Sequence, residues 1–336
     1  MMPGMALLTP LPQELFTLAV KRAGYLKSSD LRAAGVTASR VPRLIANGDL
    51  TRDIRGLFTV MASAGECRAR VGPEQYQRLR AAYGGVLAAG PTAAAAGQSA
   101  LVIMGAQGLP IHHKSEITLK NGGPSSYDNI FYNRRESYTE AYLKNGVRIV
   151  SPRLALAQAV TNLPRNNAVA VMESVVLKKL MDIEGLGAVR KMMHGRHGGS
   201  KALAWWNLVD IRAESTAETF ARLNCMDNGF PPDAVQLEVF DAQGFFVARV
   251  DLAWRLPDGR WLLGEIDGFD YHSDRDALRK DRHRQNQLIS QQTLLKRWSG
   301  TDAMNNRLAT DVRAILKNVN WRPGQVSAAD SQRICL

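Results

Sequence analysis

The sequence predicts an α/β protein with several domains. Its 336 residues exceed the length of one ordinary domain, and 45% of them are apolar, which is enough to bury substantial cores. Segments of helical periodicity alternate with short β-type runs along the chain. We therefore expect domains at 1–62, 74–200 and 205–320, followed by a polar tail at 321–336.

Charge is distributed unevenly between the two parts of the chain. The formal net charge is +12, and residues 1–200 hold 25 Lys and Arg against 13 Asp and Glu. Residues 201–336 hold 18 of each. A basic first part attracts polyanions, so DNA is the favoured partner class. The alternative is an ordinary solvated surface that happens to be rich in Lys and Arg.

Cysteine usage and the N-terminal segment indicate the compartment. Cys67, Cys225 and Cys335 lie far apart, and no Cys/His spacing predicts a zinc ribbon or a disulfide framework. The first residues lack a basic region and contain Pro10 and Pro12, so they do not resemble a signal peptide. No apolar run reaches the about 18 residues that a membrane span needs. We expect a cytoplasmic protein that spans no membrane.

The first 62 residues have the element order of a winged helix-turn-helix. Residues 12–22 have helical periodicity, and two shorter helices are expected at 28–35 and 37–48. Two strand-like pieces at 49–54 and 56–60 then form a hairpin. Three helices followed by a hairpin are what a winged module requires.

Four arginines of this module are the candidates for DNA contact. Arg40 and Arg43 are three residues apart and share one face of the third helix, and Arg52 and Arg55 lie on the hairpin. Arginines at such positions contact phosphates or base edges. A small helical module that binds a protein partner, with these arginines simply solvated, is the alternative.

Residues 74–200 predict a mixed α/β middle domain without a catalytic constellation. The small-residue segment 91–108 predicts a tightly packed helix. Strands are expected at 115–120, 129–134 and 147–150, and amphipathic helices at 151–163 and 166–181. Its four histidines are expected at surface or loop positions: His112, His113, His194 and His197.

The last part of the chain predicts a central sheet. Strands are expected at 234–241, 245–254, 261–267 and 293–299. Helices are expected around Glu214 and Glu218, over the charged segment 274–292, and near 305–317.

Three acids and a histidine fall within 22 residues of this region: Asp251, Glu265, Asp267 and His272. Glu265 and Asp267 are two residues apart on one strand, so they share a face about 6.6 Å apart. Burying three acids without a cation is costly, because like charges repel at low dielectric. Either a metal binds here or the cluster is open to water. Mg²⁺ or Mn²⁺ takes such carboxylate oxygens and activates water against phosphodiesters.

These residues occur in the order found in a known nuclease family. Asp251, the pattern E-x-D-G-x-x-x-H at 265–272, the pattern D-R-x₅-D-R-x-R-x₃-L from residue 274 and the strand LLKRW together resemble the Vsr-related (very-short-patch-repair-like) endonuclease domain. That domain has the restriction-endonuclease-like PD-(D/E)xK fold, and the resemblance covers about 210–317. The first part resembles the winged-helix region of AbiEi-type antitoxins.

The resemblance implies a role for each residue. Asp251 would be the main metal ligand and Glu265 the second acid. Asp267 stands where typical members carry lysine, and His272 matches a histidine that acts as general acid or base. Glu218 occupies the place of a supporting glutamate on the first helix. Asp251, Glu265 and Asp267 would together hold Mg²⁺ or Mn²⁺.

Asp267 departs from the usual pattern, since it leaves no lysine in the motif. His272 or an arginine of the following helix would have to replace that lysine. Three arginines of that helix lie beside its inward positions and can grip phosphate: Arg275, Arg279 and Arg282. The alternative is a solvated helix whose arginines form i,i+4 ion pairs with neighbouring aspartates.

Three functional hypotheses remain. The first is a metal-dependent DNA endonuclease or nickase, for which the resemblance implies a role in defence, mobile elements or repair. A partner protein from a defence or toxin–antitoxin system belongs to the same implication. The second is a DNA-binding regulator or antitoxin-like protein with an inactive nuclease-like domain, which the aspartate at 267 favours. The third is an interaction module whose acids bind a basic partner.

Overall fold

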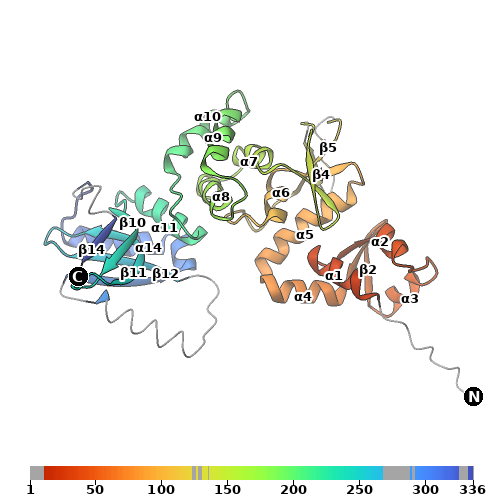
Figure 1. Cartoon of the computed structure of the whole chain (residues 1–336), viewed down its shortest axis with the longest axis horizontal. Coiled ribbons are helices and arrows are strands. Elements are labelled where there is room, and N and C mark those ends of the chain that lie inside the picture. Colours follow the sequence, from red (N-terminus) through yellow and green to blue (C-terminus); the bar gives the residue numbers. More distant parts are fainter. Residues whose placement is uncertain are drawn as a thin grey trace, which may run out of the picture. The chain divides into compact units, whose positions relative to one another are not determined.

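The computed structural model describes residues 11–122, 126–127, 131–134, 136–267, 288–289, 292–324 and 332–335. These residues form two compact units, each described by itself (Figure 1). The first unit draws on Met1–Leu163 and Leu180–Ser200, and the second on Pro164–Lys179 and Lys201–Leu336. Both units combine helices with sheets, which confirms the predicted class of an α/β chain with more than one domain.

The first unit begins with a small helical module backed by an antiparallel sheet. Its elements are α1 (Gln13–Lys21), β1 (Tyr25–Lys27), α2 (Ser28–Ala33), α3 (Val41–Ala46), β2 (Leu50–Ile54) and β3 (Leu57–Val60). The sheet order is β1-β3-β2. Leu15, Leu26 and Leu44 form part of its core. The three predicted helices and the hairpin are present, whereas β1 was not predicted, because three residues are too few to show a period.

Two helices lead from this module to a larger sheet. They are α4 (Met61–Val71) and α5 (Pro73–Ala88). The sheet has the order β6-β7-β5-β4-β9-β8. Its strands are β4 (Ala93–Ala95), β5 (Ser115–Leu119), β6 (Ser126–Tyr127), β7 (Phe131–Arg134), β8 (Ala141–Lys144) and β9 (Val147–Val150). The helices α6 (Gly97–Met104), α7 (Pro152–Val160) and α9 (Ile183–Met192) belong to the same unit.

The helix predicted at 91–108 is wrong in its first half. Ala93–Ala95 form strand β4, which lies between β5 and β9 in the sheet. Alanine is a weak strand former, yet these three side chains are at most 3% exposed. Their small size lets neighbouring elements pack closely on the sheet, so tertiary packing overrides the local helix preference. The helix begins only at Gly97.

The second unit contains a mixed sheet with the order β13-β12-β11-β10-β14. Its strands are β10 (Ala234–Phe240), β11 (Phe246–Arg255), β12 (Trp261–Asp267), β13 (Thr293–Ser299) and β14 (Arg333–Cys335). Its helices include α8 (Arg165–Leu177), α11 (Thr216–Asp227), α13 (Gly300–Met304) and α14 (Arg307–Asn318). Two short helices precede α11 in the chain, α10 (Gly199–Trp205) and η1 (Trp206–Leu208). Strands β10, β11 and β12 are antiparallel neighbours, whereas β13 and β14 run parallel to the strands they pair with.

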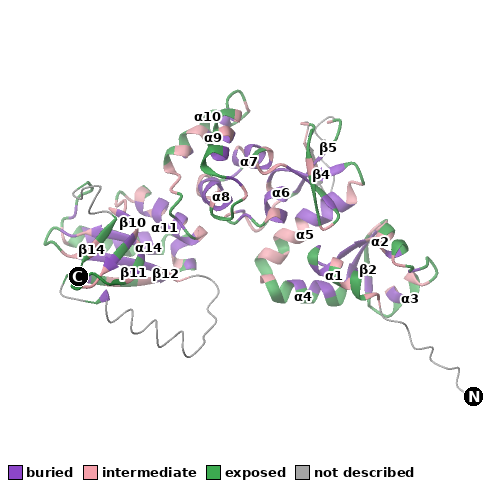
Figure 2. Cartoon of the chain, viewed as in Figure 1, coloured by how far each residue is buried: buried purple, intermediate pink, exposed green. Residues whose placement is uncertain are grey.

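The two faces of this sheet bury different clusters. Leu252, Trp254 and Leu262 pack with residues of α11 and α14. Leu237 and Leu263 belong to the cluster on the other face. Figure 2 shows buried residues along the strands and on these helices. Successive side chains of a strand point to opposite faces of the sheet, which produces this division.

Two segments differ from the predicted domain limits. Helix α8 belongs to the second unit, whereas the predicted middle domain at 74–200 included it. The predicted polar tail at 321–336 contains β14, which pairs with β10 through Ile334 and Val239. Neither contact is visible locally in the sequence, because each joins residues far apart in the chain. Across the described residues, no helix has the length and apolar character needed to cross a bilayer.

Candidate functional site

Asp251 and Glu265 meet where two antiparallel strands stop pairing. Leu252 of β11 pairs with Gly264 of β12, so Asp251 and Glu265 are the next positions along the two strands. The side chain of Asp251 replaces the missing ladder contact, since its Oδ2 accepts a hydrogen bond from the Ile266 N–H at 2.7 Å. The structure thus brings these two acids together, as their strand positions predicted.

Gln236 of β10 links Asp251 to Glu218 of α11. Its Nε2 donates to Glu218 Oε2 at 2.8 Å and to Asp251 Oδ1 at 3.2 Å. Gln236 has a φ of +56°, which is uncommon for any residue other than glycine and marks a strained position inside a strand. Sequence reasoning found Glu218 but missed Gln236, because a polar residue in an alternating strand usually faces solvent.

A buried ion pair fixes the helix that carries Glu218. Arg222 of α11 lies 2.6 Å from Glu173 of α8, and both side chains are at most 7% exposed. Glu173 also accepts hydrogen bonds from the Asp210 N–H and the Thr219 hydroxyl. Burial raises the pKa of Glu173 to about 7, and Arg222 opposes that shift. Because Thr219 follows Glu218, this network also fixes the turn that presents Glu218.

The site disfavours the charged form of its acids. Burial is the main reason that the pKa of Asp251 is raised to about 7, and the carboxylates of Glu218 and Glu265 add to the shift. Burial likewise raises the pKa of Glu218. In the part of the chain that the structure describes, neither acid forms an ion pair with Lys, Arg or His.

Arg297 of β13 contacts the other two acids. The parallel pairing of β12 and β13 sets Glu265 opposite Arg297. The Nε of Arg297 lies 3.7 Å from Glu265 Oε2, and its Nη2 donates to Asp267 Oδ1. Side-chain exposure rises from 6% at Glu265 through 23% at Arg297 to 31% at Asp267. Sequence reasoning did not select Arg297.

The acids of this site offer carboxylate oxygens as donors, but they are not arranged as a metal site in the described part of the chain. Carboxylate oxygens are the ligands that Mg²⁺ and Mn²⁺ prefer. Within the described ranges, no three His, Cys, Asp or Glu side chains converge as a metal site. Asp267 is instead engaged by Arg297.

The second unit has a cavity of about 430 Å³. Val235, Gln236, Ile211 and Arg249 are among its lining residues. Gln236 lines this cavity, and its amide donates hydrogen bonds to both Asp251 and Glu218. Gln236 therefore connects the cavity to the acid cluster.

Four of the remaining predicted site residues lie in the first unit. Arg40 precedes α3 and Arg43 lies within it, while Arg52 is in β2 and Arg55 in the turn that follows. Arg43, Arg52 and Arg55 are exposed, and Arg40 is half-buried. The other four predicted residues lie outside the described residues, so their roles stay predictions: His272, Arg275, Arg279 and Arg282.

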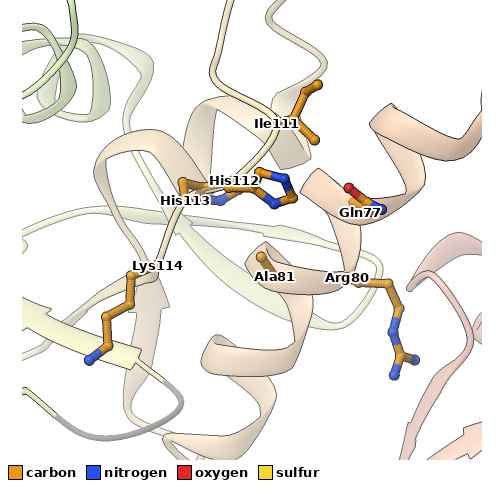
Figure 3. Close-up of a pocket in the computed structure, with 7 residues that line it drawn as sticks. All are labelled: Gln77, Arg80, Ala81, Ile111, His112, His113 and Lys114. Carbon is orange, nitrogen blue, oxygen red and sulfur yellow. The ribbon is translucent and has the colours of Figure 1, made fainter.

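A cavity of about 410 Å³ in the first unit lies between α5 and the segment 111–114 (Figure 3). His112 is exposed, as predicted, whereas both ring nitrogens of His113 are buried and have no hydrogen-bond partner in the described part of the chain. Burial, aided by Arg78, lowers the pKa of His113 to about 4, so the ring is uncharged at neutral pH. Figure 3 shows Arg80 directed away from the two imidazoles, and its guanidinium contacts Asp53. We assign no chemistry to this cavity.

Comparison with known proteins gives a partial match. No family model matches the chain. Two uncharacterized proteins of Mycobacterium tuberculosis, one from each of two strains, are 30% identical to it over 141 residues. The match covers 40% of this chain and 51% of each relative, so the chain spans about half the length of the curated relatives it matches. Because both relatives are uncharacterized, the similarity indicates no activity for this chain.

Proposed function

We propose that the protein is a metal-dependent DNA endonuclease or nickase whose active site contains Asp251, Glu265, Asp267 and Glu218. The observation that carries the proposal is the meeting of Asp251 and Glu265 where β11 and β12 stop pairing, with Glu218 joined through Gln236. Acids whose pKa values are raised by burial and by neighbouring carboxylates are typical of functional sites. The mixed sheet flanked by helices supports a restriction-endonuclease-like domain.

The chain's own residues would perform three tasks. Asp251, Glu265 and Asp267 would hold the cation, and the Ile266 N–H fixes the orientation of Asp251. Gln236 keeps Glu218 and Asp251 at a set separation. A bound Mg²⁺ or Mn²⁺ would supply Lewis acidity and a more acidic water. His272 is proposed to move a proton.

The first unit is proposed to bind DNA. The element order from α1 to β3 and the sheet order β1-β3-β2 support a winged helix-turn-helix. Exposed Arg43, Arg52 and Arg55 lie on α3 and on the hairpin that such a module turns toward DNA. The charge excess of residues 1–200 adds a sequence-independent attraction to phosphate.

A second candidate function is a DNA-binding regulator or antitoxin-like protein that does not cut. One observation favours it: Arg297 already forms ion pairs with Glu265 and Asp267, so two of the three proposed metal ligands have a cationic partner. If Arg297 neutralises these two carboxylates in the folded protein, the site does not require a bound metal ion to balance their charge.

Plasmid nicking separates the two functions. Full-length protein is incubated with supercoiled plasmid and Mg²⁺ or Mn²⁺, beside Asp251→Asn and the control Asp258→Asn. Asp258 is an acid of the β11–β12 turn that pairs with Arg260, so its loss leaves the cluster intact. We expect metal-dependent nicking by the wild type and the control, and none by Asp251→Asn.

Two other results would redirect the proposal. Band shifts without cleavage of any DNA or RNA form would favour the regulator. Unchanged DNA affinity in a triple Arg43→Gln, Arg52→Gln, Arg55→Gln variant would remove the proposed interface of the first unit.

A further inference from the structure

The cavity of about 430 Å³ in the second unit has a strained residue in its wall. Val235, Gln236 and Glu238 of β10 all line it. In a regular strand, neighbouring side chains point to opposite faces, so Val235 and Gln236 should not share a cavity. The φ of +56° at Gln236 breaks the alternation, and Val235 and Leu237 accordingly belong to different hydrophobic clusters. Backbone strain that shapes a cavity wall is typical of a functional site.

The two arginines that line this cavity already have carboxylate partners. Arg249 forms an ion pair with Glu214, and Arg212 donates two hydrogen bonds to Asp210, at 2.9 and 2.6 Å. A phosphate group would have to displace a carboxylate from one of these guanidiniums. A cationic ligand would be repelled by both guanidiniums. The cavity is therefore suited to an uncharged ligand.

Two residues of the cavity offer hydrogen-bond acceptors that no residue in the described part of the chain uses. The Gln236 Nε2 donates to both Glu218 and Asp251, and the reversed amide would set its Oε1 against their carboxylate oxygens. The Oε1 is therefore fixed as an acceptor, and no described residue donates to it. The exposed carboxylate of Glu238 likewise has no partner among the described residues. A ligand that satisfies both acceptors needs at least two N–H donors.

Apolar side chains supply another part of the lining. Leu177 at the end of α8 and Ile211 before α11 are 38% and 45% exposed, and both line the cavity. Exposed apolar surface of this kind favours contact with the flat face of a ring. The cavity volume falls in the range of roughly 300–1,000 Å³ that small-molecule pockets have. An uncharged, flat ring with two or more N–H donors is a nucleobase with an amino group. Adenine, cytosine and guanine have this group, whereas thymine does not.

We propose that this cavity binds an adenine, cytosine or guanine base that is turned out of the DNA strand. Enzymes that act on a base gain access to it by such extrusion, which costs least where the base is unpaired or mispaired. Gln236 connects the cavity to Asp251 and Glu218, so one residue would contact the base and orient the acids. The inference rests on the proposed endonuclease function and adds its substrate class, DNA with an unpaired or mispaired amino-bearing base.

Free nucleosides test the cavity apart from the remaining DNA interface, because they lack the phosphates that the first unit is proposed to bind. Deoxycytidine, deoxyadenosine and thymidine are each titrated at millimolar concentration into the full-length protein and followed by saturation-transfer NMR. We expect the two amino-bearing nucleosides to bind about tenfold more tightly than thymidine, because a base edge that lacks the matching donors is discriminated against by about this factor.

Three variants connect the preference to the cavity. Glu238→Gln replaces an acceptor with an amide that also donates, so it can pair with a thymine oxygen, and the preference for deoxycytidine should fall to near unity. Asp258→Asn makes the same exchange in the β11–β12 turn and should keep the wild-type preference. Ile211→Ser removes a contact for the ring and should weaken all three nucleosides together. Ile211 is half exposed, so its replacement should leave the fold intact.

The inference is overturned if thymidine binds as tightly as the amino-bearing nucleosides, or if Glu238→Gln keeps the wild-type preference. Binding of arginine methyl ester in place of the nucleosides would assign the cavity to a cationic side chain of a protein partner, and it would overturn the inference as well. Plasmid nicking tests the proposed function separately. Nucleoside selectivity without nicking would remove only the endonuclease activity, whereas nicking without nucleoside binding would remove only the inference.

Discussion

Each unit has an acid within a sheet, buried at Glu116 and half-buried at Asp251, and the two acids have opposite surroundings. Glu116 in the first unit is 6% exposed and accepts from the Arg134 guanidinium, with the Nε of Arg134 at 2.7 Å, and from the Gln98 amide at 3.1 Å. Asp251 in the second unit has an amide and a backbone N–H as donors, and two further acids as neighbours.

The backbone beside each acid differs in the same way. Glu116 lies against Gly97, where an added Cβ would come within 1.8 Å of its Oε2, and Gly97 adopts its φ of +49° without strain. Asp251 faces Gln236, which holds a φ of +56° with a full side chain. Glu116 therefore has charged and polar hydrogen-bond partners and an unstrained neighbour. Asp251 instead lies near two other carboxylates and beside a residue with a strained backbone. Strain of this kind persists where function requires it.

Removal of charge should therefore move the stability of the two units in opposite directions. Glu116→Gln leaves the mostly buried Arg134 without its carboxylate and should lower the free energy of unfolding by about 3 kcal/mol. Urea unfolding followed by circular dichroism, at pH 8 with a chelator present, measures this loss. If Glu116→Gln left the free energy of unfolding unchanged or raised it, the two acids would not differ as described.

Asp251→Asn should instead stabilise its unit at high pH. The folded-state pKa of Asp251 is about 7, above the ordinary value of 3.8, so the folded protein binds this proton more tightly than the unfolded chain does. Wild-type stability then falls as pH rises from about 4 to about 7, and the variant lacks that loss. We expect the variant to be about 4 kcal/mol more stable at pH 8 and equal near pH 4.

Tryptophan fluorescence isolates this effect. All six tryptophans lie between residues 205 and 321, within the second unit, so their emission reports the unfolding of that unit. If the difference in the free energy of unfolding between wild type and Asp251→Asn did not change with pH, the raised pKa of Asp251 would not be its cause.

The first unit should show the opposite pH dependence through His113. Its folded-state pKa is about 4, below the ordinary 6.5, so protonation favours the unfolded chain. Stability is fully present above pH 6.5 and is lost as pH falls toward 4. His113→Leu should remove that acid-induced loss, which amounts to about 3 kcal/mol. Circular dichroism melts between pH 7 and 4 test it, and an unchanged slope in the variant would show that the ring is already solvated.

The smallest expected effect on stability is at Gln236. Gln236→Gly relieves the positive φ but adds backbone freedom to the unfolded chain, so the free energy of unfolding should change by less than about 1 kcal/mol. Nicking should nevertheless fall about tenfold, because Asp251 and Glu218 lose the amide that orients them. A variant with full activity would mean that the bridge is incidental.

Local pattern in the sequence predicted the strands of the second unit well. The predicted limits 261–267 and 293–299 coincide with β12 and β13, because each is a short apolar run bounded by polar or turn residues. The acids on β11 and β12 could be found for the same reason, since strand spacing sets which side chains share a face.

What the sequence could not reveal depends on contacts between distant segments. Arg297 joins the cluster through the parallel pairing of β12 and β13, and Glu173 supports it through the packing of α8 on α11. Ala93–Ala95 became a strand only because two neighbouring strands enclose it. These contacts have no local signature, so neither residue spacing nor propensity could indicate them.

The pairing of β14 with β10 has a consequence for how the protein is made. Glu238 of β10 pairs with Arg333, 95 positions later in the sequence. During synthesis, the strand that carries Gln236 therefore has one side uncovered until this late segment leaves the ribosome. An uncovered strand edge invites pairing with other chains. Slow translation of the segment between β10 and β14 would lengthen that exposure, and with it the risk that nascent chains associate.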